Sequence, residues 1–203
     1  RSKWEDHERF ALVEGDACKL DFDRRFDTSN YKLVANLPYS AGSRLLGTLL
    51  DVAHPPRQLF ILLQKEVADR LTAQPGTKAY GALSVRCQLL YECRQARVVP
   101  GTVFFPPPAI RSAHVCMTLQ PDVPAQRERR AISRVAKAAF SHRRKKLARV
   151  LDGALPAADW ADLLHRRGVD EGTRADAVPP HIYRSLARAM LDAENKSADR
   201  PSR

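Results

Sequence analysis

The chain has 203 residues, of which 44% are hydrophobic, and its formal net charge is +11. This apolar content excludes a wholly disordered chain, and no stretch approaches the ~20 consecutive apolar residues of a membrane-spanning helix. The large positive charge indicates a polyanionic partner. The four cysteines lack C-x-x-C spacing and the six histidines form no ligand pattern, so we expect reduced thiols and no metal site.

The N-terminal part of the chain predicts a strand followed by a turn. Residues 1–10 are mostly charged and contain no secretory signal, whereas the apolar run from Phe10 to Val13 predicts a short strand. Gly15 and Asp16 then indicate a turn, which places a carboxylate just after the strand end. That carboxylate either accepts a hydrogen bond from a ligand or simply belongs to the turn.

The stretch Leu33–Tyr39 predicts the end of a buried strand followed by a stiff turn. Pro38 stops the strand because it has no N–H to donate and its φ is fixed. The turn presents the Asn36 side chain and the Leu37 carbonyl at a strand's carboxyl end, where open α/β sheets bind ligands. Two such acceptors can hold both protons of an adenine amine, while the Tyr39 ring stacks on the base. The same tetrapeptide also occurs in ordinary turns, so these residues alone leave both interpretations open.

Helical and strand-like patterns alternate from residue 43 onward. Apolar spacing predicts, in order, a helix over 43–52, a strand over 58–63, helices over 65–71 and 82–91, and strands over 94–99 and 113–119. This alternation is typical of an α/β sheet. We expect the last two strands to be antiparallel around a proline-rich turn.

That turn contains two phenylalanines followed by three prolines, Phe104 to Pro108. Consecutive prolines hold an extended, rigid conformation, so the turn can fix an aromatic ring at little entropic cost. It is therefore a second candidate for contact with a base. The alternative is that the rings fill the core beneath the turn, and for Phe105 we favour this alternative.

The chain becomes strongly basic after a linker marked by Pro121 and Pro124. Segment 126–150 contains ten lysines and arginines against one acid, Glu128, and predicts two helices broken near Ser141. Such a run is usually a solvated face, but like charges at helical spacing repel, and a phosphate backbone would remove that repulsion. We therefore favour RNA contact through Arg143, Arg144, Lys145, Lys146 and Arg149. Further helices are predicted over 157–166 and 180–191, and residues 192–203 are predicted to be disordered.

Five stretches, in this order, resemble the rRNA adenine N6-dimethyltransferases that act on small-subunit rRNA. They are Glu14–Ala17, Asn36–Tyr39, Leu63–Leu71, Val103–Pro108 and Ala139–Leu147. The resemblance extends from about Val13 to Met190. It implies an α/β fold: a Rossmann-like methyltransferase domain over 1–121, N-terminally incomplete, then a small all-helical rRNA-binding domain over 122–191 and a tail over 192–203.

The resemblance also implies the site residues. The catalytic set would be Asn36, Leu37, Pro38, Tyr39 and Phe104, with Tyr39 and Phe104 on either side of the target adenine. The S-adenosylmethionine site would include Asp16, Ala17 and Asn36, with Asp16 matching the acid that contacts the cofactor's adenine amine. No metal would be required.

The implied activity is dimethylation of two adjacent adenosines near the 3′ end of small-subunit (16S) rRNA during ribosome biogenesis. The implied protein is a cytoplasmic monomer that acts on the immature 30S subunit, without a membrane partner. No Gly-x-Gly turn for the cofactor is present, so we expect a β-α-β unit of about 30 residues or more to be missing. The chain alone would then be inactive.

Three other interpretations stay open. One is a large-subunit rRNA adenine methyltransferase of the antibiotic-resistance type, although Leu37 and the F-x-P-P-P loop favour the small-subunit enzyme. Another is a non-catalytic RNA-binding or ribosome assembly factor, which would explain the absent glycine-rich turn. The third is a relative of the mitochondrial transcription factors in this family.

Overall fold

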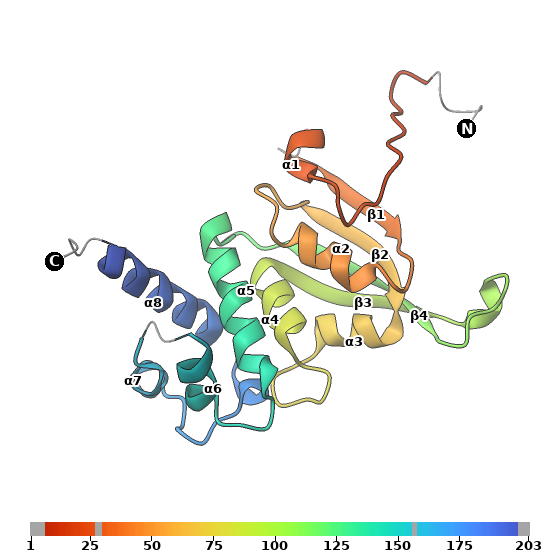
Figure 1. The fold of residues 1–203 in the computed structure, drawn as a ribbon. Coiled ribbons are helices and arrows are strands. Elements are labelled where there is room, and N and C mark those ends of the chain that lie inside the picture. The colour runs from red at the N-terminus through yellow and green to blue at the C-terminus, as the bar shows by residue number, and fades with distance from the viewer. Residues whose placement is uncertain (1–6, 27–29, 156–157, 199–203) are drawn as a thin grey trace.

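The apolar runs predicted as strands form one four-stranded sheet (Figure 1). The structure, a computed structural model, describes residues 7–26, 30–155 and 158–198. The strand order is β1-β2-β4-β3. Strand β1 is parallel to β2, whereas β4 is antiparallel to both β2 and β3. The bounds are β1 Lys32–Asn36, β2 Gln58–Gln64, β3 Tyr91–Val99 and β4 Ser112–Leu119.

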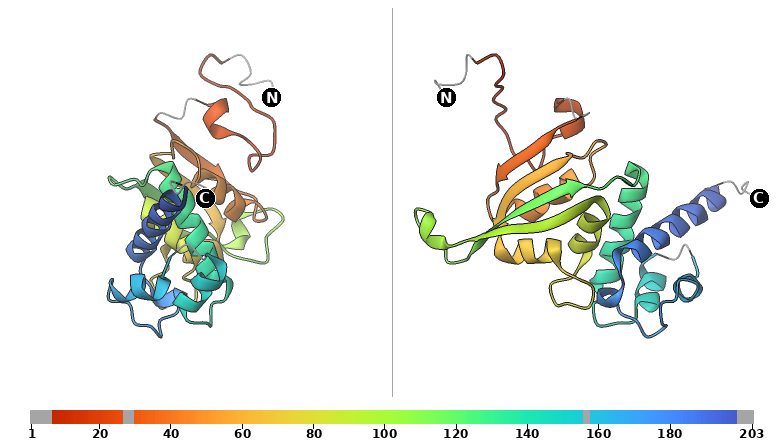
Figure 2. Two further views of the ribbon diagram at one scale, coloured as in Figure 1. Left: turned by 60° about the vertical axis from the view of Figure 1, so that its left-hand side comes forward. Right: turned by 180° about the vertical axis from the view of Figure 1, so that it is seen from behind.

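Three helices cover one face of this sheet, as the views from the front and from behind show (Figures 1 and 2). They are α2 (Gly42–Leu49), α3 (Lys65–Thr72) and α4 (Ala82–Leu90). Side chains alternate between the two faces of a strand, so Leu59 and Ile61 of β2 are buried beneath the helices. On the opposite face, Phe60 is 42% exposed and Val34 of β1 is 81% exposed.

The expected strand from Phe10 to Val13 is wrong. These residues are irregular, and Phe10 is 45% exposed. A strand needs a neighbour to accept its backbone hydrogen bonds, and this segment pairs with none of the described strands. A four-residue helix, α1 (Phe22–Arg25), follows instead, capped by the Asp21 carboxylate.

Four helices form a second core at the C-terminal end. They are α5 (Gln126–Ser141), α6 (Leu147–Ala154), α7 (Trp160–His165) and α8 (Pro180–Ala198), and two short 3-10 turns lie at η1 (Gly101–Val103) and η2 (Ala175–Ala177). Trp160, Tyr183 and Met190 are fully buried among them. The predicted break near Ser141 is confirmed. No helix among the described residues is long and apolar enough to cross a bilayer.

Helix α8 continues beyond its predicted end at Leu191, so the expectation of disorder from residue 192 is wrong as far as Ala198. Its last turns are tied to α5 across the helix pair. Arg134 Nη1 lies 2.7 Å from Glu194 Oε1, and Arg127 Nη2 donates to Asn195 Oδ1 at 2.6 Å. Polar composition alone could not reveal these cross-helix pairs. Residues 199–203 lie outside the described part.

One buried arginine joins the helical core to the sheet. The Arg129 guanidinium, on α5, donates hydrogen bonds to the carbonyls of Leu50 (3.1 Å), Pro124 (2.7 Å), Val52 and Ala53 (3.3 Å). Burial lowers the pKa of this guanidinium. The carbonyls replace the water that the buried guanidinium has lost. The same hydrogen bonds hold the chain reversal that follows α2, so the orientation of α5 is coupled to the end of α2.

We expect Arg129→Met to lower the free energy of unfolding by about 3 kcal/mol, because several buried carbonyls would lose a charged donor. Urea unfolding followed by circular dichroism measures the change. Arg130→Met is the matched control, since Arg130 is the exposed neighbour and the charge change is identical. The control should stay within about 0.5 kcal/mol of the parent. Equal losses of unfolding free energy in both variants would contradict the role of Arg129 in joining the helical core to the sheet.

Candidate active site

The site begins where β1 ends. The Leu37 N–H donates to the Leu62 carbonyl at 3.3 Å, which is the last bond between β1 and β2, and Pro38 has no N–H to continue the ladder. The Pro38 carbonyl then accepts from the N–H groups of Ala41 (2.9 Å) and Gly42 (3.1 Å). The chain therefore turns directly from β1 into α2, and the predicted strand-end turn is confirmed.

This turn leaves two acceptors open. Within the described part of the chain, neither the Asn36 side-chain amide nor the Leu37 carbonyl takes part in a hydrogen bond, and the Asn36 side chain is exposed. The Leu37 side chain is only 8% exposed, so it anchors the turn in the core. Two free oxygens thus sit on a fixed backbone, an arrangement suited to a ligand with two donated protons.

The Tyr39 ring is held at its far end. Its hydroxyl and the Ser112 Oγ are 2.7 Å apart. Ser112 is the first residue of β4 and is fully buried. Because β4 runs antiparallel to β2, with Ser112 opposite Gln64, the start of β4 lies at the sheet edge where β1 and β2 end. This hydrogen bond fixes the ring orientation and leaves a ring face for contact.

The loop between β3 and β4 forms the other wall of the site, across from the turn that contains Pro38. It begins with the η1 turn, where the Phe104 N–H donates to the Gly101 carbonyl at 3.1 Å. A Cβ at Gly101 would lie 2.8 Å from the Pro108 carbonyl oxygen, so only glycine lets the two limbs of the loop approach this closely. Phe104 is partly buried. Phe105 is 100% exposed, so the expectation that its ring fills the core is wrong.

The turn and the loop enclose a cavity of about 360 Å³. Its walls are Asn36, Leu37, Pro38, Tyr39, Leu62, Phe104, Phe105, Pro106 and Pro108. The structure therefore brings all five predicted catalytic residues into one cavity. Sequence reasoning missed Leu62 and Ser112 because both depend on strand register, and it missed the contribution of Phe105.

The predicted cofactor residues lie beside the start of α2. Asp16 Oδ1 accepts from the Cys18 N–H at 2.9 Å, which makes the turn, and its Oδ2 is 3.7 Å from Arg44 Nη2. The Cys18 thiol lies 3.9 Å from the Ala41 carbonyl, so this turn packs against the chain that leads from the cavity into α2. Asp16 and Ala17 do not line the 360 Å³ cavity itself.

Comparison with known proteins identifies the family. The family model described as ribosomal RNA adenine dimethylase matches residues 1–190. The chain belongs to that family. Ribosomal RNA small subunit methyltransferase A of Syntrophotalea carbinolica is 38% identical over 188 residues, which cover 91% of this chain and 71% of that protein. The protein of the same name from Caulobacter vibrioides is 40% identical over 183 residues, covering 90% and 69%.

Solved structures agree on the fold. A dimethyladenosine transferase from Plasmodium falciparum matches with a TM-score of 0.70 at 20% identity, over 92% of this chain and 72% of that one. The 23S rRNA methyltransferase ErmE matches with a TM-score of 0.62 at 18% identity, over 88% and 71%. The expected Rossmann-like α/β fold with a helical C-terminal region is confirmed. As a member of the ribosomal RNA adenine dimethylases, the chain is of the S-adenosylmethionine-dependent methyltransferase class.

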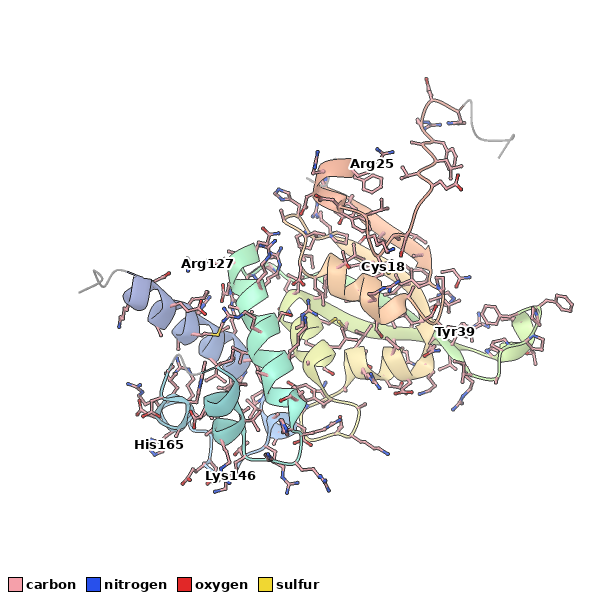
Figure 3. The ribbon with its side chains drawn as sticks, viewed as in Figure 1. Cys18, Arg25, Tyr39, Arg127, Lys146 and His165 are labelled. Atoms are coloured by element: carbon pink, nitrogen blue, oxygen red, sulfur yellow. The ribbon has the colours of Figure 1, made fainter. Side chains whose placement is uncertain are left out.

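In this dimethylase, the predicted RNA-binding cations lie around the α5–α6 connection, away from Tyr39 (Figure 3). Arg144, Lys145 and Arg149 are exposed, and their side chains have no hydrogen-bond or ion-pair partner among the described residues. Lys146 Nζ lies 3.8 Å from a Glu171 carboxylate oxygen. These four side chains therefore present positive charge to solvent.

Arg143 differs from its neighbours. Its Nη2 donates to the Tyr80 carbonyl at 2.6 Å and to the Thr77 carbonyl at 3.2 Å, and its Nε lies 3.8 Å from Asp176 Oδ2. It therefore ties the end of α5 to the loop before α4. The run of four cations in the sequence gave no sign that its first member points inward.

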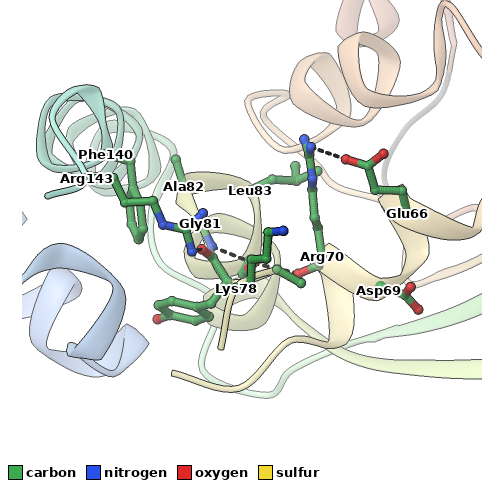
Figure 4. Close-up of a pocket in the computed structure, with 12 residues that line it drawn as sticks. Glu66, Asp69, Arg70, Lys78, Gly81, Ala82, Leu83, Phe140 and Arg143 are labelled. Carbon is green, nitrogen blue, oxygen red and sulfur yellow. Dashed lines mark hydrogen bonds and ion pairs between the residues drawn. The ribbon is translucent and has the colours of Figure 1, made fainter. Parts of the chain in front are cut away.

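A larger hollow of about 810 Å³ lies beside this contact (Figure 4). Its charged lining has both signs, from Glu66, Asp69, Arg70, Lys78 and Arg143. None of the predicted catalytic residues lines it. The candidate active site is the smaller cavity at the sheet edge, where the predicted catalytic residues meet.

The buried thiols carry no chemistry at this site. Burial raises the pKa of Cys93 to about 12 and that of Cys87 well above its ordinary value. Both thiols stay protonated at neutral pH, and thiols react as thiolates. Among the described residues, no three His, Cys, Asp or Glu side chains are grouped so that they could hold a metal ion.

We expect Gly101→Ala to displace the loop that carries Phe104, because its Cβ would overlap the Pro108 carbonyl oxygen. Hydrogen exchange of the loop amides measures this, and the Phe104 amide should exchange at least about tenfold faster, a loss of ~1.4 kcal/mol of local stability. Gly47→Ala is the control, since its Cβ would meet nothing closer than Arg86 Nη1 at 3.8 Å. If the Phe104 amide exchanged at the parent rate in Gly101→Ala, the close approach of Gly101 to the Pro108 carbonyl would be contradicted.

Proposed function

We propose that this protein dimethylates N6 of two adjacent adenosines near the 3′ end of small-subunit (16S) rRNA, with S-adenosylmethionine as methyl donor, during ribosome biogenesis. One observation carries the proposal: two unpaired acceptors share a base-sized cavity with two aromatic rings. The relatives named as small-subunit methyltransferases are 38% and 40% identical to this chain, which supports the small subunit as the target.

The two acceptors address the chief difficulty of the reaction. The exocyclic amine of adenine is a weak nucleophile because its lone pair is delocalised into the ring. When its two N–H groups donate to the Asn36 side-chain oxygen and the Leu37 carbonyl, the lone pair is directed out of the plane of the base. Both acceptors are held by the Pro38 turn, so no reorganisation is needed when the reaction occurs.

The aromatic rings hold the base in that orientation. Tyr39 and Phe104 would stack on its two faces, and base–aromatic stacking contributes about 1–3 kcal/mol for each base. The Tyr39 hydroxyl is engaged with Ser112, so it positions the ring and takes no proton. Methylation makes the amine nitrogen a cation that releases its proton to water without a general base.

S-adenosylmethionine, when bound, supplies an electrophilic methyl group. Asp16 fits a role in holding it, because among the described residues its Oδ2 has only the 3.7 Å contact with Arg44 and can accept from an adenine amine. Ala17 and Asn36 would complete the part of the cofactor site that lies in this chain. Asn36 would then lie between cofactor and target base.

RNA would be held by the helical part. The exposed cations Arg144, Lys145, Lys146 and Arg149 would contact phosphates of folded rRNA, which is recognised mainly through shape and backbone. We propose a limit between the two domains at residue 121, with the helical domain including α8 as far as Ala198 in place of the expected limit at 191. The partner would be the immature 30S subunit, and the enzyme would act as a cytoplasmic monomer.

We expect Asn36→Ala in the full-length enzyme to reduce methylation at least about 100-fold, because one of the two amine acceptors is lost. Incorporation of labelled methyl groups into small-subunit rRNA measures activity, and RNA affinity should change less than twofold. Asn30→Ala is the matched control, since Asn30 lies before the other end of β1, where its side chain accepts a hydrogen bond from Arg57 at 3.4 Å. Activity above one tenth of the parent in Asn36→Ala would refute the catalytic assignment.

We also expect that neutralising Arg144 and Lys145 to glutamine lowers the slope of log affinity against log salt by about 1–2, since each phosphate contact contributes ~0.7–0.9. Arg143 is left unchanged so that the α5 contact stays intact. The pair Arg24→Gln and Arg25→Gln on α1 removes the same charge from another exposed surface. An equal change in both double variants would mean that net charge, and not this surface, binds the RNA.

A further inference from the structure

One aromatic side chain has no role in the reaction just described. Phe105 is 100% exposed, more than any other large apolar side chain among the described residues. Leaving a phenyl ring in water forgoes about 2–3 kcal/mol of burial free energy. This loss of burial free energy is specific to Phe105, because the adjacent Phe104 is partly buried in the same loop.

The exposed Phe105 lies in a loop whose backbone is restricted. The η1 turn is closed by the bond from the Phe104 N–H to the Gly101 carbonyl, and Gly101 packs directly against Pro108. Three consecutive prolines follow the ring and restrict the backbone. The loop projects beyond the end of the sheet between β3 and β4 (Figures 1 and 2). Phe105 is thus held outward at the rim of the 360 Å³ cavity, which it also lines.

The surroundings of this ring suit a nucleic acid. From Cys93 to Pro121 the chain contains no Asp or Glu, and it contains Arg94, Arg97 and Arg111, all exposed. Two of these arginines lie on β3, and the third lies directly before β4. Glu92, near the start of β3, is the one acid of this hairpin. The charges beyond it are all cationic and the aromatic tip is fully exposed, so the hairpin combines phosphate attraction with base stacking, the two terms by which proteins hold unpaired bases.

An adenine that enters the cavity leaves a gap in its RNA, and that gap suits an aromatic ring. An adenine held between Tyr39 and Phe104 must leave the base stack of its RNA, and unstacking costs a few kcal/mol. The departed base leaves a gap beside its neighbour, and an aromatic ring that stacks on that neighbour compensates for the lost stacking. Phe105 directly follows Phe104 in the chain and lies fully exposed at the rim of the cavity that would hold the flipped base.

We infer that Phe105 is an RNA wedge: its ring stacks on the base adjacent to the target adenosine and fills the gap left when the target enters the cavity. This inference rests on the proposed function. Phe105 is a positioning residue for the reaction, since it touches the neighbouring base and not the reacting amine. It acts on the substrate's conformation, so its contribution appears in RNA binding without any methyl transfer.

The test uses the full chain and a hairpin from the 3′ end of small-subunit rRNA. The RNA carries 2-aminopurine at the base adjacent to the target adenosines, so the targets keep the N6 amine that the cavity binds. We expect Phe105→Ala to weaken binding roughly 5- to 150-fold, which corresponds to ~1–3 kcal/mol of stacking. The adjacent 2-aminopurine should become at least about twofold brighter in that complex, because it loses its stacking partner.

Three further variants make the result specific. Phe105→Trp should restore affinity and quenching, whereas Phe105→Leu should restore neither, since leucine has no π-face. Val103→Ala removes another exposed apolar side chain of the same loop and should change affinity less than twofold. Rescue by leucine, or an affinity within twofold of the parent for Phe105→Ala, would overturn the wedge.

Failure of the proposed function would look different. If the parent protein did not bind the hairpin, or if Tyr39→Ala and Phe104→Ala both left its affinity for the hairpin unchanged, both the base cavity and the wedge would be overturned. If Tyr39→Ala weakened binding while Phe105→Ala matched the parent in affinity and in fluorescence, only the wedge would be overturned. Because the ring is fully exposed, urea unfolding of the Phe105 variants should match the parent.

Discussion

Proline at position 38 cannot donate a hydrogen bond, and the site depends on that constraint. The last bond of the β1–β2 ladder is the one from the Leu37 N–H to the Leu62 carbonyl, after which the Pro38 carbonyl caps the start of α2. The backbone between these two points has no freedom to reach another acceptor or donor. The Asn36 amide and the Leu37 carbonyl therefore stay open at the end of an otherwise complete sheet, and a buried Leu37 side chain prevents the turn from retracting.

The second half of the site depends on antiparallel pairing. In an all-parallel sheet, the start of a neighbouring strand would lie at the opposite edge. Because β4 reverses direction, its first residue, Ser112, comes to the edge where β1 ends and fixes the Tyr39 hydroxyl. The same reversal places the β3–β4 loop over that edge. The helical core is attached at a different point, through Arg129 and the carbonyls after α2. This attachment fixes the position of the exposed cations around the α5–α6 connection relative to the cavity.

Sequence patterns located the elements well because each pattern has a local cause. The strands, the break at Ser141 and the Pro38 turn follow from side-chain period and from backbone chemistry that a few neighbouring residues decide. The errors have nonlocal causes. Phe10–Val13 has a strand pattern but no strand beside it, and α8 is prolonged by pairs such as Arg134–Glu194 from another helix. Arg143 looked like its basic neighbours until its carbonyl partners were known. Leu62 entered the cavity through register alone.

Phe105 shows how one hairpin can serve two surfaces. Adjacent residues of an extended segment point to opposite sides, so Phe104 lies partly buried at the cavity while Phe105 points into solvent. The pattern Phe-Phe-Pro-Pro-Pro does not predict which ring is buried and which is exposed, because both are equally apolar and equally close to the prolines. The deciding contact is between Gly101 and Pro108, which brings the limbs of the loop together and sets its orientation above the sheet edge. If Phe104 contacts the flipped base, Phe105 is the next residue along the chain and is in place for the base left behind.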